Sequence, residues 1–198
     1  LPIAKKHGVK TIIHSHSTSN GDGIQAYIKA MMQYPLRFQA DYFFACSNEA
    51  GQWLYGKRIC DSNKYLVLPN GIDLSKYSFS EEERENFRQQ FGFIGKKVVI
   101  HVGRFHKSKN HSFLLSVFKE IHHRKSNSIL VLVGDGDERG IIEQQISDYN
   151  LTDSVEILGY RNDIPQLLCA SDLFLFPSVW EGLGISAIEA QAAGLPTI

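Results

Sequence analysis

The sequence predicts an α/β protein with a Rossmann-like, doubly wound parallel sheet. Between residues 98 and 192, short apolar runs alternate with stretches whose apolar residues recur at helical spacing. Apolar strands that alternate with amphipathic helices are typical of βαβ units, in which helices cover both faces of a parallel sheet. The 198 residues, 43% hydrophobic and 21% charged, are enough for one substantial core or two small ones.

The most regular elements lie in the second half of the chain. Strands are expected at four apolar runs, 98–102, 129–133, 155–158 and 173–176. Helices are expected at 81–91, 113–121, 141–146, 164–168 and 185–192, where apolar residues recur every three or four positions. Glu81, Glu82 and Glu83 favour the positive end of the first of these helices. Pro177 closes the last strand because proline has no N–H to donate.

The first 69 residues contain shorter elements of the same kinds. A helix ends at Gly8, and strands are expected at 11–13, 41–45 and 64–68. Ser47 is a candidate N-cap for the helix that contains Trp53 and Leu54. After a polar loop at 17–23, a helical stripe is formed by Ile24, Tyr27, Ile28, Met31 and Met32.

A polar, unperiodic stretch separates the two halves. We therefore expect a linker at 70–80, between a first domain at 1–69 and a second at 81–198. The chain starts at Leu1 rather than Met, and residues 195–198 read as the beginning of a buried strand. Both ends look cut through structure, which indicates a part of a larger protein.

The composition excludes several classes of protein. Lys and Arg together equal Asp and Glu, 21 of each, which argues against a nucleic-acid partner because such proteins carry a basic excess. Cys46, Cys60 and Cys169 are odd in number and widely spaced, as expected of free thiols in a reducing compartment. No apolar run approaches the ~18 residues of a membrane span, and no signal peptide is seen. We expect a cytoplasmic protein, with contact at the inner face of the membrane left open.

Two loops of the predicted sheet carry the candidate ligand site. In a doubly wound sheet, ligands bind beyond the carboxyl ends of the strands, where the strand order reverses. The loop after 98–102 contains Arg104 and Lys109, and the loop after 173–176 contains glycines at 182 and 184 before a helix. Two cations and exposed backbone N–H groups at a helix start suit a phosphate or diphosphate. The alternative is that both cations are ordinary solvated loop residues.

Two further motifs resemble functional sites. Residues 134–140 nearly match a dinucleotide fingerprint, but Asp135 and Asp137 would repel a pyrophosphate, and these residues also resemble a metal-binding Asp-x-Asp pair. A tight polar turn that caps the next helix is the favoured interpretation. His14 and His16 share one face of an extended chain, and they are metal ligands, base- or sugar-binding groups, or ordinary loop residues.

Four motifs in order carry a resemblance to a known family. Residues 69–73, Gly103 and Arg104 with Lys109, residues 133–136, and residues 181–189 together resemble family 4 glycosyltransferases. These are retaining, nucleotide-sugar-dependent enzymes of the GT-B fold. Residues 46–48 with 53–56 look closest to the bacterial branch that makes capsular or exopolysaccharide. The resemblance makes 1–69 the remnant of an acceptor-side domain and 81–198 a nucleotide-sugar-binding domain that is truncated at its end.

The resemblance also implies roles for individual residues. The nucleotide-sugar site would comprise Gly103, Arg104, Lys109, Tyr160, Arg161, Gly182, Leu183, Gly184 and Glu189. The catalytic group would comprise Arg104, Lys109, Glu181 and His16. Arg104 and Lys109 would stabilise the leaving diphosphate, Glu189 would hold the ribose hydroxyls, and Glu181 would contact the transferred sugar. His16, or else His14, would point toward that sugar. No metal and no cofactor is implied.

The expected function is a transferase that moves a sugar, with retention, from a UDP-sugar to a surface-polysaccharide or lipid-linked acceptor. One alternative is a glycoside hydrolase or phosphorylase that uses Glu181 and Glu189 as an acid and nucleophile pair. Another is a non-catalytic nucleotide-binding fragment. Arg104 and Lys109 favour the transferase, because hydrolysis of a neutral glycan needs no diphosphate site.

Overall fold

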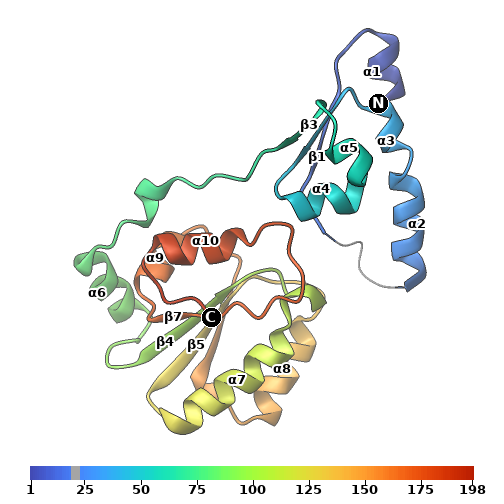
Figure 1. Cartoon of the computed structure of the whole chain (residues 1–198). Helices are drawn as coiled ribbons and strands as arrows, with labels where there is room; N and C mark the ends of the chain where they lie inside the picture. Colours follow the sequence, from blue (N-terminus) through green and yellow to red (C-terminus); the bar gives the residue numbers. More distant parts are fainter. Residues whose placement is uncertain (19–22) are drawn as a thin grey trace. The chain divides into compact units, whose positions relative to one another are not determined.

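The computed structural model describes residues 1–18 and 23–198 and divides them into two compact units (Figure 1). The first unit comprises Leu1–Gly71 and Trp180–Gly184, and the second comprises Ile72–Val179 and Ile185–Ile198. Part of the predicted polar loop at 17–23 lies outside the described residues. Among those described, no helix is both long and apolar enough to cross a membrane.

The second unit is built on a parallel sheet in the order β6-β5-β4-β7. Its strands are β4 (Lys97–Val102), β5 (Ser128–Val133), β6 (Val155–Gly159) and β7 (Leu173–Phe174). β4 therefore pairs with β5 on one side and with β7 on the other, in register at Ile100 and Phe174. The strand order reverses at β4, so the carboxyl ends of β4 and β7 form the switch point at which such sheets bind ligands.

Helices cover both faces of this sheet (Figure 1). The helical elements are η1 (Leu74–Tyr77), α6 (Glu81–Gln90), η2 (Lys107–Lys109), α7 (His111–Arg124), α8 (Arg139–Asp148), η3 (Thr152–Ser154), α9 (Ile164–Cys169) and α10 (Ile185–Ala192). Alternate strand residues face opposite sides. Val98 and Ile100 pack in one core with Leu167 of α9, and Val99 packs in the other with Phe118 of α7.

The predicted fold class, α/β with a Rossmann-like, doubly wound parallel sheet, is confirmed. The strand expected at 173–176 is shorter in the structure, because ladder pairing with β4 covers only Leu173 and Phe174. The expected linker at 70–80 contains the helical turn η1. Tyr77, the last residue of η1, is buried in the core of the second unit. The sequence pattern missed this turn because it is a single turn of helix.

A half-buried carboxylate fixes the start of two strands of the second unit. Asp172, directly before β7, accepts a hydrogen bond from the backbone N–H of Val98 at 2.8 Å. Arg84 and Arg88 of α6 bond the same carboxylate at 2.6 and 3.3 Å. Burial alone would raise the pKa of Asp172, but the Val98 N–H and the two guanidinium groups hold this pKa below its usual value. The carboxylate therefore joins β4, β7 and α6.

The first unit contains a smaller parallel sheet in the order β1-β2-β3. Its elements are α1 (Pro2–Lys6), β1 (Ile12–Ser15), α2 (Gly23–Gln33), α3 (Leu36–Gln39), β2 (Tyr42–Ala45), α4 (Asn48–Tyr55), α5 (Lys57–Cys60) and β3 (Tyr65–Val67). The predicted cap of α4 is confirmed, because Ser47 Oγ accepts a hydrogen bond from Ala50 N at 3.1 Å. Phe43, Ala50 and Tyr55 belong to the buried core.

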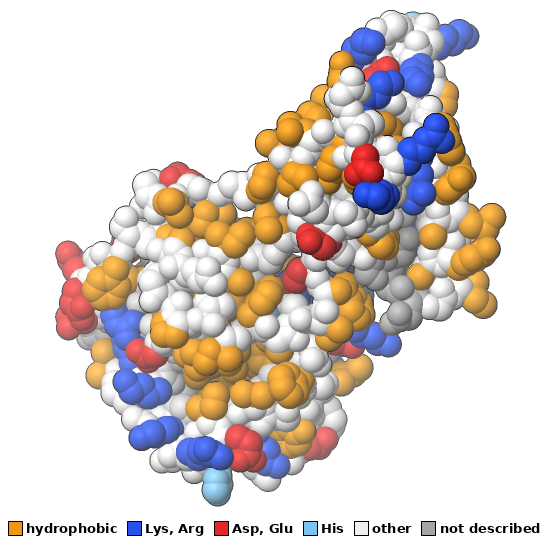
Figure 2. All heavy atoms as spheres, viewed as in Figure 1, with side chains coloured by type: hydrophobic (Ala, Val, Ile, Leu, Met, Phe, Trp, Pro, Cys, Tyr) orange, Lys and Arg blue, Asp and Glu red, His pale blue; other side chains and the backbone are white. Residues whose placement is uncertain are grey.

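The helical stripe of α2 is exposed to solvent. Ile24, Tyr27, Met31 and Met32 keep 81%, 70%, 62% and 73% of their surface exposed. Figure 2 shows hydrophobic side chains on the surface in this region. The helix itself is confirmed, but its apolar face is not part of the core of the first unit.

Candidate functional site

The loop after β4 presents two cations at the carboxyl end of the sheet. Arg104 is exposed and pairs with Asp137 at 3.2 Å, a surface contact of small energy. Lys109 ends the turn η2, which His106 caps by accepting a hydrogen bond from Ser108 N at 3.2 Å. The ammonium of Lys109 lies 5.7 Å from the centre of the Phe176 ring. One cation is thus solvated, while the other is half-buried beside the segment that follows β7.

Glycines shape this loop by allowing close backbone approach. Gly134 has a φ of 137°, and a Cβ there would collide with the carbonyl oxygen of Gly103. A Cβ at Gly136 would likewise collide with the backbone of Phe105. Phe105 N also donates to the carbonyl of Asp135 at 2.9 Å. The motif at 133–136 therefore acts as a support for the loop after β4.

Asp135 makes local hydrogen bonds and does not cap α8. Its carboxylate accepts hydrogen bonds from Gly136 N at 2.8 Å and from Arg139 at 3.1 Å. The N-cap position of α8 is Glu138, and its side chain makes no capping bond. Asp135 thus stays in a polar turn, as predicted, although it does not cap α8. Across the described parts of the chain, no group of three His, Cys, Asp or Glu residues is placed to hold a metal ion.

Two buried imidazoles lie beneath the loop. His101 Nδ1 is 2.8 Å from the carbonyl oxygen of Leu175, so this nitrogen carries the proton and donates. His101 Nε2 and both nitrogens of His111 have no hydrogen-bond partner among the described residues. The two rings meet edge to face at 5.0 Å. Burial lowers the pKa of His101 to about 4 and that of His111 to about 3, so both are neutral.

His101 connects the ends of β4 and β7. Pairing between β4 and β7 stops after Phe174, and the His101 side chain then bonds Leu175. A Cβ at Gly103 would lie 3.1 Å from His101 Nε2 and 3.2 Å from Cε of Lys109. The Lys109 side chain and the neutral His101 imidazole therefore both lie close to Gly103.

The loop after β7 meets the loop after β4 within the second unit. Val179 N donates to the carbonyl of Ser108 at 2.8 Å. Beyond this loop, α10 carries Glu189, whose Oε1 accepts a hydrogen bond from the hydroxyl of Tyr77 at 2.7 Å. The second unit thus contains Arg104, Lys109 and Glu189 of the predicted site.

The predicted base-binding residues, Tyr160 and Arg161, follow β6. Tyr160 is 78% exposed. Arg161 forms a two-point contact with Asp163, at 2.9 and 2.5 Å, and its guanidinium lies 5.5 Å from the centre of the Phe91 ring. Both residues line an open polar hollow with Asp163. The Tyr160 side chain is therefore accessible to a ligand, whereas the guanidinium of Arg161 is hydrogen-bonded to Asp163.

The remaining predicted residues belong to the first unit. His14 lies within β1 and His16 directly after it, with ring centres 4.0 Å apart. Burial and the neighbouring His16 lower the pKa of His14. His16 Nδ1 is 3.3 Å from the side-chain nitrogen of Asn70, in the motif at 69–73.

Residues 181–184 are grouped with this unit as well. The carbonyl of Glu181 accepts a hydrogen bond from the hydroxyl of Thr18 at 2.8 Å. A Cβ at Gly182 would collide with the carbonyl of His16, and Leu183 packs against the first core. The structure thus places Gly182 against the His16 backbone, with Glu181, Leu183 and Gly184 in the same short segment.

The sequence reasoning missed three residues that support the site. Tyr77 lies in the stretch expected to be a linker, while His101 and His111 lie inside a strand and at a helix start, where they have no motif spacing. The sequence signal that could have identified the two histidines is a polar residue within an otherwise apolar segment. Nothing in the sequence pattern linked Tyr77 to Glu189, 112 positions away.

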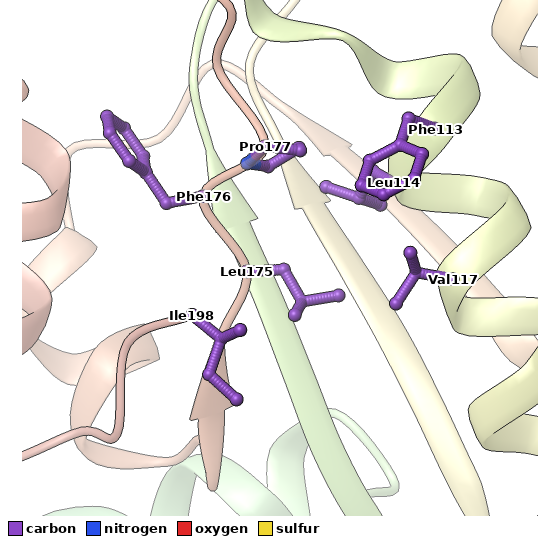
Figure 3. A pocket seen from close by; sticks show the side chains of 7 residues that line it. All are labelled: Phe113, Leu114, Val117, Leu175, Phe176, Pro177 and Ile198. Carbon is purple, nitrogen blue, oxygen red and sulfur yellow. The ribbon is translucent and has the colours of Figure 1, made fainter.

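A separate apolar hollow of about 290 Å³ lies beside α7 (Figure 3). It is lined by Phe113, Leu114, Val117, Leu175, Phe176, Pro177 and Ile198. Figure 3 shows these side chains on α7, on the segment after β7 and at the C-terminal residue. Its lining lacks the charged groups that a phosphate needs, so it is distinct in chemistry from the loop of Arg104 and Lys109.

The fold and these loops define an α/β protein with a cationic loop at the switch point of a parallel sheet. The chain belongs to the family described as Glycosyl transferases group 1, which matches residues 83–198. It is 35% identical over 191 residues to "Putative glycosyltransferase EpsF" of Bacillus subtilis (strain 168), covering 94% of this chain and 50% of the relative.

Further similarities agree with this family. Over 152 residues the chain is 36% identical to the UDP-Gal:alpha-D-GlcNAc-diphosphoundecaprenol alpha-1,3-galactosyltransferase of Escherichia coli, covering 72% of this chain and 39% of the relative. The crystal structure of Anabaena Alr3699/HepE in complex with UDP and glucose is similar with a TM-score of 0.85 and 26% identity. That match covers 98% of this chain and 53% of the HepE chain. The chain therefore spans about half the length of such relatives, or less.

Proposed function

We propose that the protein to which this chain corresponds transfers a sugar, with retention, from a UDP-sugar to a surface-polysaccharide or lipid-linked acceptor. The observation that carries the proposal is the loop after β4, which presents Arg104 and Lys109 at the switch point of the sheet. HepE, similar over 98% of this chain, has been crystallised with UDP and with UDP-glucose. The Escherichia coli relative is named for a UDP-galactose donor and a diphosphoundecaprenol acceptor.

In this proposal the second unit is the nucleotide-sugar-binding domain. Lys109 and Arg104 neutralise the diphosphate, and they stabilise the charge that develops on it as it leaves. Arg104 would exchange its exposed contact with Asp137 for the stronger, charge-assisted bonds to phosphate. Glu189 accepts hydrogen bonds from the ribose, and Tyr160 packs on the base.

The proposal also covers the roles of residues in the first unit, the branch of the family and the place in the cell where the enzyme acts. His16 and Glu181 contact the transferred sugar, and residues 1–69 belong to the acceptor-side domain, joined through 70–80. Membership of family 4 and of the exopolysaccharide branch is supported by the name EpsF and by the motifs at 46–48 and 53–56. The proposed enzyme works without a metal or cofactor, and it acts in the cytoplasm on an acceptor at the membrane face.

Calorimetric titration with UDP tests the site assignment on this chain. Lys109→Ala is expected to weaken UDP binding about 30-fold, because hydrogen bonds that involve a charged group contribute about 1.5 to 3 kcal/mol. Arg104→Ala is expected to lose a similar factor. Lys107→Ala is the matched control, since Lys107 is an exposed lysine of the same turn. Equal affinity in all four proteins would contradict the diphosphate site.

The reaction is tested on the full-length protein. Incubation with a panel of UDP-sugars and lipid-linked acceptors should yield UDP and a glycoside whose anomeric configuration, read by NMR, matches that of the donor. Activity should persist in EDTA. An inverted product would contradict retention, and loss of activity in EDTA that Mg²⁺ restores would contradict metal independence. Cleavage of a glycan without any nucleotide sugar would favour the hydrolase alternative.

A further inference from the structure

Tyr77 and Glu189 form a short hydrogen bond within the second unit. The Tyr77 hydroxyl lies 2.7 Å from Oε1 of Glu189, although the two residues are 112 positions apart. Tyr77 keeps only 8% of its surface exposed and belongs to the same buried core as Phe93, Leu167 and Ala190. The phenol ring is thus fixed by packing, while its hydroxyl points to the middle of α10.

The motif before Tyr77 holds it in this position. Ile72 packs against the same core. The carboxylate of Asp73 then accepts hydrogen bonds from the backbone N and the hydroxyl of Ser75, at 3.2 and 2.6 Å. The hydroxyl bond and then the backbone bond lower the pKa of Asp73, so it stays charged as the cap of η1. The single turn η1 carries the chain from this cap to Tyr77.

The chemistry of the pair is that of a donor and a carboxylate. Burial first, and then the bond to Glu189, raise the pKa of Tyr77. The phenol therefore keeps its proton and donates a hydrogen bond to the carboxylate. An ionised carboxylate has about four acceptor sites on its two oxygens, so one bond from Tyr77 leaves the others open. A glutamate has three rotatable side-chain bonds, and fixing one oxygen restricts where the other can lie.

We propose that Tyr77 is a positioning residue that orients the Glu189 carboxylate toward the ribose hydroxyls of the nucleotide. The inference rests on the proposed function, in which Glu189 holds the ribose. It gives the motif at 69–73 a task at the donor site: Asp73 caps η1, η1 presents Tyr77, and Tyr77 fixes Glu189. Tyr77 itself touches no ligand atom in this scheme.

The test compares two nucleotides that differ only in the ribose. UDP and 2′,3′-dideoxyuridine diphosphate are titrated into this chain and into its Tyr77→Phe variant. We expect Tyr77→Phe to bind UDP about tenfold more weakly, a factor that corresponds to about 1.4 kcal/mol, while binding of the dideoxy nucleotide is unchanged. Tyr149→Phe is the matched control, because its hydroxyl also holds a hydrogen bond, at 3.1 Å to Gln145, at the end of α8.

A double-mutant cycle separates positioning from general packing. Glu189→Ala should also lose the preference for UDP over the dideoxy nucleotide, and adding Tyr77→Phe to it should cost nothing further. In the full-length enzyme, Tyr77→Phe should raise KM for the UDP-sugar more than it lowers kcat. Equal UDP affinity in the wild-type and Tyr77→Phe proteins would overturn the inference. So would an equal loss for both nucleotides, which would indicate a change in packing.

A second variant keeps the inference testable if Tyr77→Phe does not fold. Asp73→Ala acts from the surface, since the Asp73 side chain is 56% exposed. It should produce a smaller loss, about threefold, again for UDP alone. Unchanged UDP binding in a folded Asp73→Ala would then count against the inference. A wild-type chain that binds no UDP would overturn the proposed function itself, an outcome distinct from UDP binding that depends on Lys109 but not on Tyr77.

Discussion

In each unit, an aspartate fixes the start of a strand by a hydrogen bond to the neighbouring strand, but the surroundings of the two aspartates differ. In the second unit, Asp172 precedes β7 and accepts a hydrogen bond from Val98 N at 2.8 Å. In the first, Asp41 precedes β2 and accepts one from Thr11 N, also at 2.8 Å, with a second from the Thr11 hydroxyl at 3.0 Å. In each case a carboxylate before one strand bonds the backbone at the start of its neighbour.

The difference lies in what surrounds the carboxylate. Asp172 is backed by Arg84 and Arg88, all three side chains being at most 23% exposed. Among the described residues, the charges that act on Asp41 beside its bonds to Thr11 are those of Lys10 and Lys5. Charge interactions are several times stronger where water is excluded. Equal hydrogen-bond lengths therefore do not imply equal contributions to stability.

The helices of the two units differ in the same way. α7 buries Leu114, Leu115 and Phe118 against the larger sheet. α2 has an equally clear apolar stripe, but Met31 and Met32 on it are mostly exposed. An apolar stripe predicts a helix in both places. The stripe stabilises the unit only where it packs against another element.

The largest expected effect comes from truncating a side chain on each of these helices. Phe118→Ala should lower the free energy of unfolding of the second unit by about 4 kcal/mol, because a fully buried phenylalanine leaves a cavity. Met31→Ala should change the stability of the first unit by less than about 0.5 kcal/mol, as for other surface positions. Hydrogen exchange read by mass spectrometry reports each unit separately. Equal losses would show that the two helical faces do not differ in burial in solution.

The next effect comes from the two aspartates. Asp172→Ala should cost the second unit about 3 kcal/mol, since it removes a largely buried carboxylate from two guanidinium groups and a backbone N–H. Asp41→Ala should cost the first unit less, because its carboxylate bonds Thr11 without the two guanidinium groups that contact Asp172. Hydrogen exchange is measured on both variants, and Asp153→Ala, at an exposed position, is the control. A larger loss of stability for Asp41→Ala than for Asp172→Ala would contradict the comparison.

The smallest effect is a pH dependence of the second unit. His101 and His111 have folded-state pKa values of about 4 and 3, below the unfolded value of about 6.5. Their contribution to stability is therefore fully present above pH 6.5 and is lost as the pH falls toward the folded values. We expect a loss of about 2 kcal/mol between pH 7 and pH 5.5 in denaturant titrations.

A variant pair checks the source of this pH dependence. His111→Phe should flatten the slope by about half, because it removes one of the two buried imidazoles. His123→Phe, at an exposed position near the end of the same helix, should leave the slope unchanged. An unchanged slope in His111→Phe would mean that other groups cause the acid sensitivity.

The sequence was most informative where a pattern repeats. The apolar runs near 100 and 130 predicted the paired strands β4 and β5, and Ser47 predicted a cap that the structure contains. The loop after β4 could be placed at the switch point because strand order follows from βαβ topology. The roles assigned to Arg104, Lys109 and Glu189 remain predictions.

Contacts between distant side chains could not be predicted in this way. The bond from Tyr77 to Glu189 depends on a single helical turn within a stretch that has no periodicity. Burial of His101 and His111 depends on how α7 packs over β4, which a local pattern does not encode. The exposed stripe of α2 shows the converse, since the pattern gave the helix correctly but not its surroundings.

The contact between Gly134 and Gly103 has a consequence for the reading of mutational scans. The backbone after β5 fits against the backbone after β4 so closely that Gly134 and Gly136 do not tolerate a larger residue without a shift of the cationic loop. In a scan scored by donor binding, we expect Gly134 and Gly136 to be as intolerant as Lys109, although neither glycine has a side chain that could touch a ligand. Intolerance at these two positions would then report on the backbone that supports the site. Residues that contact the ligand would be identified only by substitutions in the loop after β4 itself.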